Sequence, residues 1–212
     1  MEHFVGTSFT TISGSGPNAA VIHYRPKPGE SRVISRGDIY LVDSGGQYKD
    51  GTTDVTRTVH MGSPSSRERE CFTRLTTTVF PKGIMGYSLD AIARTSLWKA
   101  GLDYVHGTGH GVGSYLNVHE GPMRLSSRYN AYDPGLEEGM NNGGNKEFLT
   151  FENLTLVPIQ KKLIEPKMLT KEEVSYINDY HMLCKEKVGP LLKQLGLQDA
   201  LNWLNRETEP LG

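Results

Sequence analysis

Apolar and polar residues follow two spacings along the chain, one typical of strands and the other typical of helices. β-Branched or alternating apolar residues predict four strands, over residues 19–24, 38–43, 52–60 and 148–159. Apolar residues at helical spacing, or charges suited to a helix, predict four helices, over residues 65–74, 88–101, 170–195 and 198–206. Glycine-rich turns separate strands in the first half, so the pattern predicts an α+β fold with an antiparallel sheet.

Local signals refine two of these regions. Thr170 and Glu173 form a capping-box pattern, which places the start of the long helix at this point. Gly189-Pro190 is expected to break or kink the same helix, because proline lacks the amide hydrogen that a helix needs. Residues 106–113 are too rich in glycine for a helix and are expected to form a tight connection into a short strand.

Composition narrows the class of protein. The 212 residues carry a formal charge of -1, which gives no broad electrostatic attraction for nucleic acid. No apolar run approaches the ~18 residues of a membrane span, and the start of the chain has no signal-peptide layout. Cys71 and Cys184 cannot staple a chain of this size and are interpreted as reduced thiols. We therefore expect one cytoplasmic domain over residues 1–212, with no nucleic-acid or membrane partner.

The first chemical signal is a pair of aspartates on neighbouring predicted strands. If the two strands pair antiparallel with Asp43 opposite Asp54, the Cβ atoms lie about 4.5–5.5 Å apart. Two carboxylates at this distance repel each other, and a divalent cation between them removes the conflict. In the alternative interpretation the register differs, and both aspartates are solvated turn residues beside Asp50. The spacing by itself leaves both interpretations open.

Four of the seven histidines lie in settings that are informative about chemistry. His106 and His110 are flanked by glycines, which let the backbone approach a ligand and let an imidazole ring project from a tight turn. No glutamate follows His106, so the helical zinc-protease motif is absent. His119 closes the same segment, and His23 lies at the end of the first predicted strand. Each of the four has an alternative structural role as a hydrogen-bonded side chain.

Missing motifs exclude two other kinds of site. The glycines of residues 107–113 alternate, but Val112 breaks the spacing of a dinucleotide-binding loop. The chain has no Gly-Lys-Ser or Gly-Lys-Thr phosphate loop and no Gly-x-Ser-x-Gly nucleophile elbow. A nucleotide-binding fold and a serine hydrolase are therefore not expected.

Five stretches of the sequence, taken together, are distinctive. They are VIHY at 21–24, LVDSGGQYKDGTTDVTRT at 41–58, HGTGHGVGSYLNVHEGP at 106–122, LTFENLTLVPI at 149–159 and ALNWLNRET at 200–208. These stretches resemble, in order and over nearly the whole chain, the catalytic domain of the cytosolic Xaa-Pro aminopeptidases, the aminopeptidase P family.

The resemblance implies a fold, an activity and a cofactor. The fold is the pita-bread fold, in which an antiparallel sheet flanked by helices holds two divalent metal ions, usually manganese. The implied activity is that of a metallopeptidase that removes an N-terminal residue when proline follows. The implied partners are therefore peptides with proline in the second position, and a homodimer is a further expectation because catalytic domains of this family often dimerise.

The resemblance also assigns roles to single residues. By position, Asp43 and Asp54 match carboxylate metal ligands, and His110 matches the imidazole ligand. The remaining three histidines match residues that position the substrate and share protons without binding metal; they are His23, His106 and His119.

The chain departs from the family after residues 136–140. The family continues with a Glu-Pro-Gly segment and then with a strand that carries a second glutamate, and both glutamates bind metal. Here residues 141–145 follow at once, and the Glu-Pro-Gly segment has no counterpart. Glu152 resembles the second glutamate, although its flanking residues match the next family strand better. A gap also follows Arg74, and the family's amino-terminal domains are absent, so the fold is expected to be incomplete.

Charge then limits the number of metal ions. Two divalent cations carry four positive charges, whereas Asp43 and Asp54 supply two negative charges and a neutral His110 supplies none. A second cation without compensating oxygen ligands is costly to place in a poorly hydrated pocket. We therefore predict at most one tightly held metal ion and a severely reduced peptidase turnover.

Three alternatives stay open from the sequence. A rearranged glutamate replaces the missing ligands, with Glu138, Glu147 and Glu152 as the candidates. The second alternative is a non-catalytic pita-bread domain that binds a peptide or a partner protein. The third is a truncated product without a defined role.

Overall fold

The computed structural model describes residues 3–73, 80–81, 83–136, 148–149 and 152–212. The chain forms two compact units, and each is assembled from three stretches of sequence. The first unit contains Met1–Thr11, Ser44–Asp54 and Leu75–Glu152, and the second contains Ile12–Asp43, Val55–Arg74 and Asn153–Gly212. The single domain expected over residues 1–212 stays a prediction.

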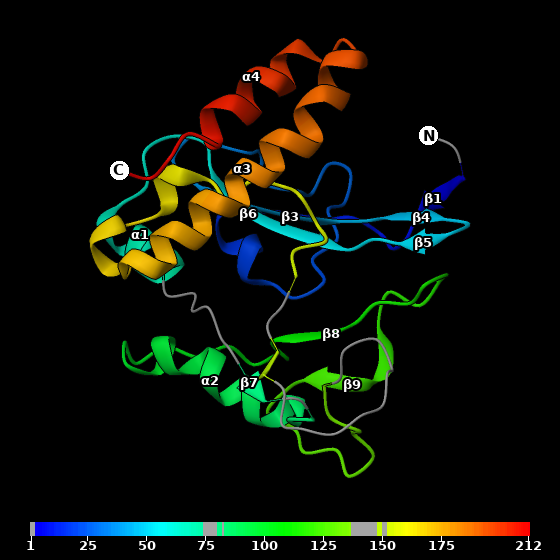
Figure 1. The fold of residues 1–212 in the computed structure, drawn as a ribbon. Helices are drawn as coiled ribbons and strands as arrows, with labels where there is room; N and C mark the ends of the chain where they lie inside the picture. Colours follow the sequence, from blue (N-terminus) through cyan, green and yellow to red (C-terminus); the bar gives the residue numbers. More distant parts are fainter. Residues whose placement is uncertain (1–2, 74–79, 82, 137–147, 150–151) are drawn as a thin grey trace. The chain divides into compact units, whose positions relative to one another are not determined.

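A three-stranded sheet forms one layer of the second unit (Figure 1). Strand β3 (Ile39–Ser44) lies between β2 (Ile12–Ser15) and β6 (Val55–His60). Strands β2 and β3 are antiparallel, with Ile12 opposite Asp43 and Ser15 opposite Tyr40. The predicted strands at residues 38–43 and 52–60 are thus confirmed, although the second begins at Val55.

The strand predicted over residues 19–24 is wrong. Its first residues belong to the 3-10 helix η1 (Gly16–Ala20), which has Pro17 in its first turn. Here the chain turns back so tightly that a Cβ atom on Gly14 would lie 2.6 Å from the carbonyl oxygen of Asn18. His23 has a φ of 56°, a left-handed conformation that a strand does not allow. Local turn chemistry therefore overrides the apolar pattern of this segment.

Three α-helices complete the second unit: α1 (Ser66–Thr73), α3 (Lys171–Gln194) and α4 (Gln198–Glu207). All three were predicted, and the capping box of Thr170 and Glu173 is formed at the start of α3. Helices α3 and α4 lie side by side (Figure 1) and share a core of buried side chains. This core contains Tyr180, Cys184 and Leu204, with Leu156, Ile159, Val188, Leu192 and Trp203 packed around it.

The predicted break at Gly189-Pro190 is wrong, because α3 continues through both residues to Gln194. Gly189 is buried, and a Cβ atom there would lie 3.9 Å from the side chains of Leu201 and Leu204 on α4. Packing of the two helices thus stabilises a helical conformation that proline disfavours locally.

Hydrogen bonds from β6 attach the sheet of this unit to α3. The guanidinium of Arg57 donates to the carbonyl oxygen of Val157, at 2.9 and 2.7 Å, and to the Tyr180 hydroxyl at 2.7 Å. The Tyr180 hydroxyl also accepts from the amide of Val157 at 3.2 Å. Of the strand predicted over residues 148–159, the segment 152–159 is not a strand, because side chains of β6 and α3 take hydrogen bonds of its backbone. Residues 150–151 lie outside the described residues.

His181 on α3 is fully buried and binds the backbone rather than a ligand. Its Nε2 accepts the amide hydrogen of Ile159 at 3.1 Å, so this nitrogen carries no proton. Its Nδ1 is also buried and has no hydrogen-bond partner among the described residues. Burial lowers the pKa of His181 below its ordinary value of 6.5, because the imidazolium form loses its hydration there; the positive charge of Lys161 acts in the same direction.

We expect the second unit to become less stable as the pH falls from 7.5 to 5.5. A histidine whose pKa is lowered by folding stabilises the fold fully above its unfolded pKa, and this contribution is lost as the pH falls toward the folded pKa. The urea midpoint, followed by Trp203 fluorescence in a Trp98→Phe background, should therefore decrease over this range. In His181→Gln, which keeps an acceptor for the Ile159 amide, the dependence should flatten. An equally steep dependence in that variant would contradict the assignment.

Among its described residues, the first unit contains three small antiparallel sheets and one α-helix. A three-stranded sheet contains β1 (Phe4–Thr7), β4 (Gly46–Tyr48) and β5 (Gly51–Thr52). Strand β7 (Phe80–Pro81) pairs with β10 (Phe148–Leu149), and β8 (Gly109–Gly111) pairs with β9 (Glu120–Leu125). The predicted helix is confirmed as α2 (Gly86–Trp98), which packs against β9. Gly86 allows this contact, because a Cβ atom there would overlap the carbonyl of Arg124.

Within the part of the chain that the structure describes, no helix is both long and apolar enough to span a membrane.

Candidate metal centre

The best-defined part of the candidate site lies in the first unit, where His110 and Asp54 meet. His110 occupies the middle of the short strand β8 and pairs with Arg124 of β9. Gly111 follows it, and a Cβ atom at this position would lie 2.4 Å from the carbonyl oxygen of Glu120. Glycine is thus required for β8 to approach β9, and the approach fixes the backbone that carries His110. The Nε2 atom of His110 lies 3.4 Å from Oδ2 of Asp54.

The hydrogen bond of His110 Nδ1 determines what can bind between His110 Nε2 and Asp54 Oδ2. Nδ1 of His110 lies 2.9 Å from the carbonyl oxygen of Gly111, which can only accept, so Nδ1 is the donor. In the neutral ring, Nε2 is then a lone pair that faces a carboxylate oxygen. A cation between the two atoms, either a proton or a metal ion, relieves this repulsion. Metal-bound histidines commonly donate their second N–H to a backbone carbonyl, so the residues present fit a divalent metal.

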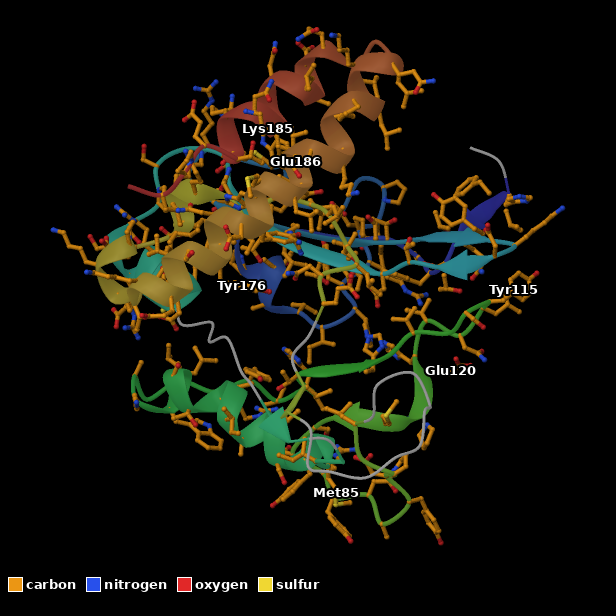
Figure 2. All side chains as sticks on the ribbon, viewed as in Figure 1. Met85, Tyr115, Glu120, Tyr176, Lys185 and Glu186 are labelled. Atoms are coloured by element: carbon orange, nitrogen blue, oxygen red, sulfur yellow. The ribbon has the colours of Figure 1, made fainter. Side chains whose placement is uncertain are left out.

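His119 lies beside His110, with ring centroids 4.0 Å apart and an edge-to-face angle of 65°. Its position depends on the connection between β8 and β9, whose outer part carries Tyr115 and which returns at Glu120 (Figure 2). Leu116 and Asn117 have φ values of 59° and 53°, a conformation that leucine rarely adopts. The Thr52 hydroxyl donates to the Leu116 carbonyl at 3.0 Å and holds this turn.

His106 precedes β8 in a separate loop. Its Nδ1 lies 2.8 Å from the carbonyl oxygen of Gly107 and donates to it, and its ring stacks on Tyr104 with centroids 4.7 Å apart. The rest of the ring is exposed. The strand predicted in residues 106–113 is confirmed as β8. His106 is thus a second exposed histidine of this segment, beside His110.

Asp43 and His23 belong to the second unit. Asp43 lies near the end of β3, and its Oδ1 atom is buried without a hydrogen bond from any described residue. A buried carboxylate oxygen without a donor suits a cation. β3 and β6 are neighbours in the sheet, but a register that places Asp43 opposite Asp54 stays a prediction. His23 is exposed on the turn after η1.

Of the three candidate glutamates, the structure describes only Glu152. Glu152 is exposed, and Glu138 and Glu147 lie outside the described residues, as do residues 137–145. Within the described ranges, no group of three or more histidine, cysteine, aspartate or glutamate side chains is arranged to hold a metal ion. The assignment of metal ligands to Asp43, Asp54, His110 and Glu152 therefore stays a prediction.

Comparison with known families identifies the class of protein. The model of metallopeptidase family M24 matches residues 1–141, and the model of the C-terminal region of peptidase M24 matches residues 147–211. The chain belongs to metallopeptidase family M24, and its fold is the pita-bread α+β fold of that family.

Its relatives are Xaa-Pro aminopeptidases. A probable Xaa-Pro aminopeptidase P of Laccaria bicolor is 44% identical over 248 residues, which cover 100% of this chain and 38% of the relative. Aminopeptidase P1 of Arabidopsis thaliana is 46% identical, over 99% of this chain and 38% of the relative. The crystal structure of X-prolyl aminopeptidase from Caenorhabditis elegans, a cytosolic enzyme with a di-nuclear active site, has a TM-score of 0.87 and 36% identity. The match covers 100% of this chain and 40% of the C. elegans chain.

These comparisons confirm the predicted family and fold. The chain spans about two fifths of the length of these relatives. The predicted manganese is confirmed only as far as the family is one of metallopeptidases and the C. elegans enzyme has a di-nuclear site.

Sequence reasoning missed the buried pair of Asp90 and Arg94 on α2. Burial by itself would raise the pKa of Asp90, but hydrogen bonds from Arg94 and Thr108 outweigh this effect and hold it below its ordinary value. The hydrogen bond with Asp90 in turn raises the pKa of Arg94. An aspartate and an arginine four residues apart on a predicted helix indicate an ion pair. Such pairs are usually exposed to solvent, so the spacing does not predict burial.

Proposed function

We propose that this chain is the metal-binding core of an Xaa-Pro aminopeptidase, which removes the N-terminal residue from peptides with proline in the second position. The observation that carries the proposal is the approach of His110 Nε2 to Asp54 Oδ2 at 3.4 Å, with the other ring nitrogen already bonded to a carbonyl. Membership of family M24 and the similarity to Xaa-Pro aminopeptidases support the same activity.

Three side chains of the chain would hold manganese in this proposal. Asp54 and His110 of the first unit would supply an oxygen and a nitrogen ligand. The family resemblance adds Asp43, whose Oδ1 atom is buried without a described donor. When bound, manganese polarises the scissile carbonyl and lowers the pKa of the attacking water.

The remaining histidines would act on the substrate. Because Nδ1 of His106 donates to Gly107, the Nε2 atom of the neutral ring is an acceptor, and in this exposed residue it can receive a substrate N–H. His119, held edge-on against His110, would donate a hydrogen bond to the carbonyl oxygen as negative charge develops there. His23 would contribute a further hydrogen bond to the same charge.

The number of metal ions follows from the segments that this chain lacks. The alignment with the Laccaria relative extends over 248 residues, more than the 212 of this chain, so relatives contain internal residues without a counterpart here. We propose that the Glu-Pro-Gly segment and its metal-binding glutamate are among the residues without a counterpart. Two carboxylates and one neutral imidazole balance the charge of one tightly held divalent metal ion but not that of a second.

Metal analysis combined with an activity assay tests the proposal. After dialysis from excess Mn²⁺, we expect at most one manganese ion per chain. We also expect slow, Mn²⁺-dependent release of the first residue from an Xaa-Pro tripeptide and none from the matched tripeptide with alanine in place of proline. Two retained ions would refute the single-metal state. Absence of any release, with manganese bound, would favour the non-catalytic peptide- or protein-binding domain.

We also propose a cytoplasmic location and a homodimer. The location rests on the similarity to the C. elegans enzyme, which is described as cytosolic. The homodimer rests on the family resemblance, and sedimentation of the purified chain distinguishes it from a monomer.

A further inference from the structure

The side chain of Arg94 leaves α2 and binds the loop that carries His106. Its Nε donates to Asp90 Oδ2 at 2.7 Å within the helix, and its Nη1 donates to Asp103 Oδ1 at 2.7 Å. Nη2 donates to the carbonyl oxygen of His106 at 2.6 Å, and Nη1 also donates to the carbonyl of Tyr104. One guanidinium thus holds the backbone at Tyr104 and at His106, on the two sides of residue 105.

Asp90 binds the same loop on the C-terminal side of His106. Its Oδ1 accepts a hydrogen bond of 2.6 Å from the hydroxyl of Thr108, two residues after His106. Asp90 is 1% exposed and Arg94 is 3% exposed, so the pair is shielded from water. Charge-assisted hydrogen bonds of this kind are short and directional, and they leave the backbone between Tyr104 and Thr108 little freedom.

The same guanidinium also orders the ring against which His106 stacks. The Cζ atom of Arg94 lies 3.8 Å from the centroid of the Tyr104 ring, and the Tyr104 and His106 rings are 4.7 Å apart at 27°. The Tyr104 hydroxyl is hydrogen-bonded to that of Thr108. The buried Asp90–Arg94 pair therefore fixes the backbone of the exposed His106 directly and its ring through Tyr104 and Thr108. Glycines at 107, 109 and 111 would otherwise allow this segment many conformations.

We infer that the Asp90–Arg94 pair and Thr108 position the imidazole of His106, so that α2 sets its orientation toward a substrate. This inference rests on the proposed function for the role of the oriented ring, but the positioning itself is a property of the folded chain. Asp90, Arg94 and Thr108 are positioning residues, because none of them touches the reacting atoms.

Two variants of Thr108 test the inference with little change in shape. Thr108→Val removes the hydroxyl and keeps the branched side chain, whereas Thr108→Ser keeps the hydroxyl. Thr95→Val is the matched control. Thr95 is exposed on α2, and within the described residues its hydroxyl donates only to the Ala91 carbonyl of the same helix. The readout is the NMR resonance of the His106 ring protons, which stacking on Tyr104 displaces, assigned with His106→Gln.

In Thr108→Val we expect the His106 ring resonance to move toward the position of an unstacked histidine, while Thr108→Ser and Thr95→Val resemble wild type. For the Xaa-Pro tripeptide we expect kcat about ten-fold lower in Thr108→Val at a nearly unchanged KM, because small displacements of positioned groups reduce rates strongly. A wild-type His106 resonance and a wild-type kcat in Thr108→Ser would support the inference further.

An unchanged His106 resonance in a folded Thr108→Val chain would overturn the inference, and so would an equal shift in Thr95→Val. If Thr108→Val does not fold, Arg94→Lys replaces it. Lysine keeps the charge opposite Asp90 but cannot reach both loop carbonyls, so the same resonance shift is expected and its absence overturns the inference. If wild type releases no residue from the tripeptide, the proposed function fails, whereas the resonance still decides the positioning.

Discussion

Asp54→Asn is expected to weaken Mn²⁺ binding by more than about 100-fold, since even residues that only support metal ligands contribute up to that factor. The Asp54 carboxylate faces the Nε2 lone pair of His110 at 3.4 Å, and it supplies a negative charge that asparagine lacks. An asparagine amide would instead donate a hydrogen bond to the same nitrogen and stabilise the site without metal. Titration of free Mn²⁺ by electron paramagnetic resonance measures the affinity directly, and release of the first residue from the Xaa-Pro tripeptide should be lost in parallel.

Asp50→Asn is the matched control for this experiment. Asp50 is exposed in the turn between β4 and β5 and has the same charge as Asp54, so its replacement changes the net charge equally. We expect its Mn²⁺ affinity to stay within about two-fold of wild type, because solvent and salt screen the interaction of an exposed charge with a cation that it does not bind. Equal loss in both variants would indicate diffuse electrostatic binding. Residual peptide release that Asp54→Asn leaves unchanged would indicate a contaminating peptidase.

Arg94→Met is expected to destabilise the first unit by about 3–5 kcal/mol, the cost typical of removing one partner of a buried ion pair. The Asp90 carboxylate would stay 1% exposed with only Thr108 as a described hydrogen-bond donor to its side chain. The carbonyls of Tyr104 and His106 would lose donors at the same time. Urea unfolding followed by Trp98 fluorescence, in a Trp203→Phe background, reports on this unit because Trp98 ends α2.

Arg128→Met is the control, because Arg128 is exposed in the same unit and its replacement should cost less than about 0.5 kcal/mol. The double variant Arg94→Met with Asp90→Leu should recover part of the lost stability, since it removes the unpaired buried charge. A double variant as unstable as the sum of the single variants would contradict a direct coupling of the two side chains.

Local chemistry was sufficient for helices α1 to α4 and for strands β3 and β6. The capping box of Thr170 and Glu173 began α3 as predicted, because both of its hydrogen bonds form between neighbours in sequence. The prediction failed at residues 19–24, where a proline and a left-handed His23 override an apolar run. It failed again at Gly189-Pro190, where contact with α4 stabilises the helix.

For the candidate site, the sequence named the chemical groups but not their supports. Asp54 and His110 were recognised from their motifs, and the structure adds the distance between them and the carbonyl that fixes the ring. The Thr52 contact with Leu116 and the Thr108 contact with Asp90 join residues 64 and 18 positions apart. No periodicity or motif contains such pairings.

The sequence by itself determined the family, the α+β class and the types of side chain available to a metal, because these depend on residue identity and on spacing along the chain. Only the tertiary structure decided that the Asp90–Arg94 pair is buried beneath the His106 loop and that the Nε2 atom of His110 faces Asp54. Burial and orientation depend on which distant segments exclude water from a side chain, and they arise when the chain folds.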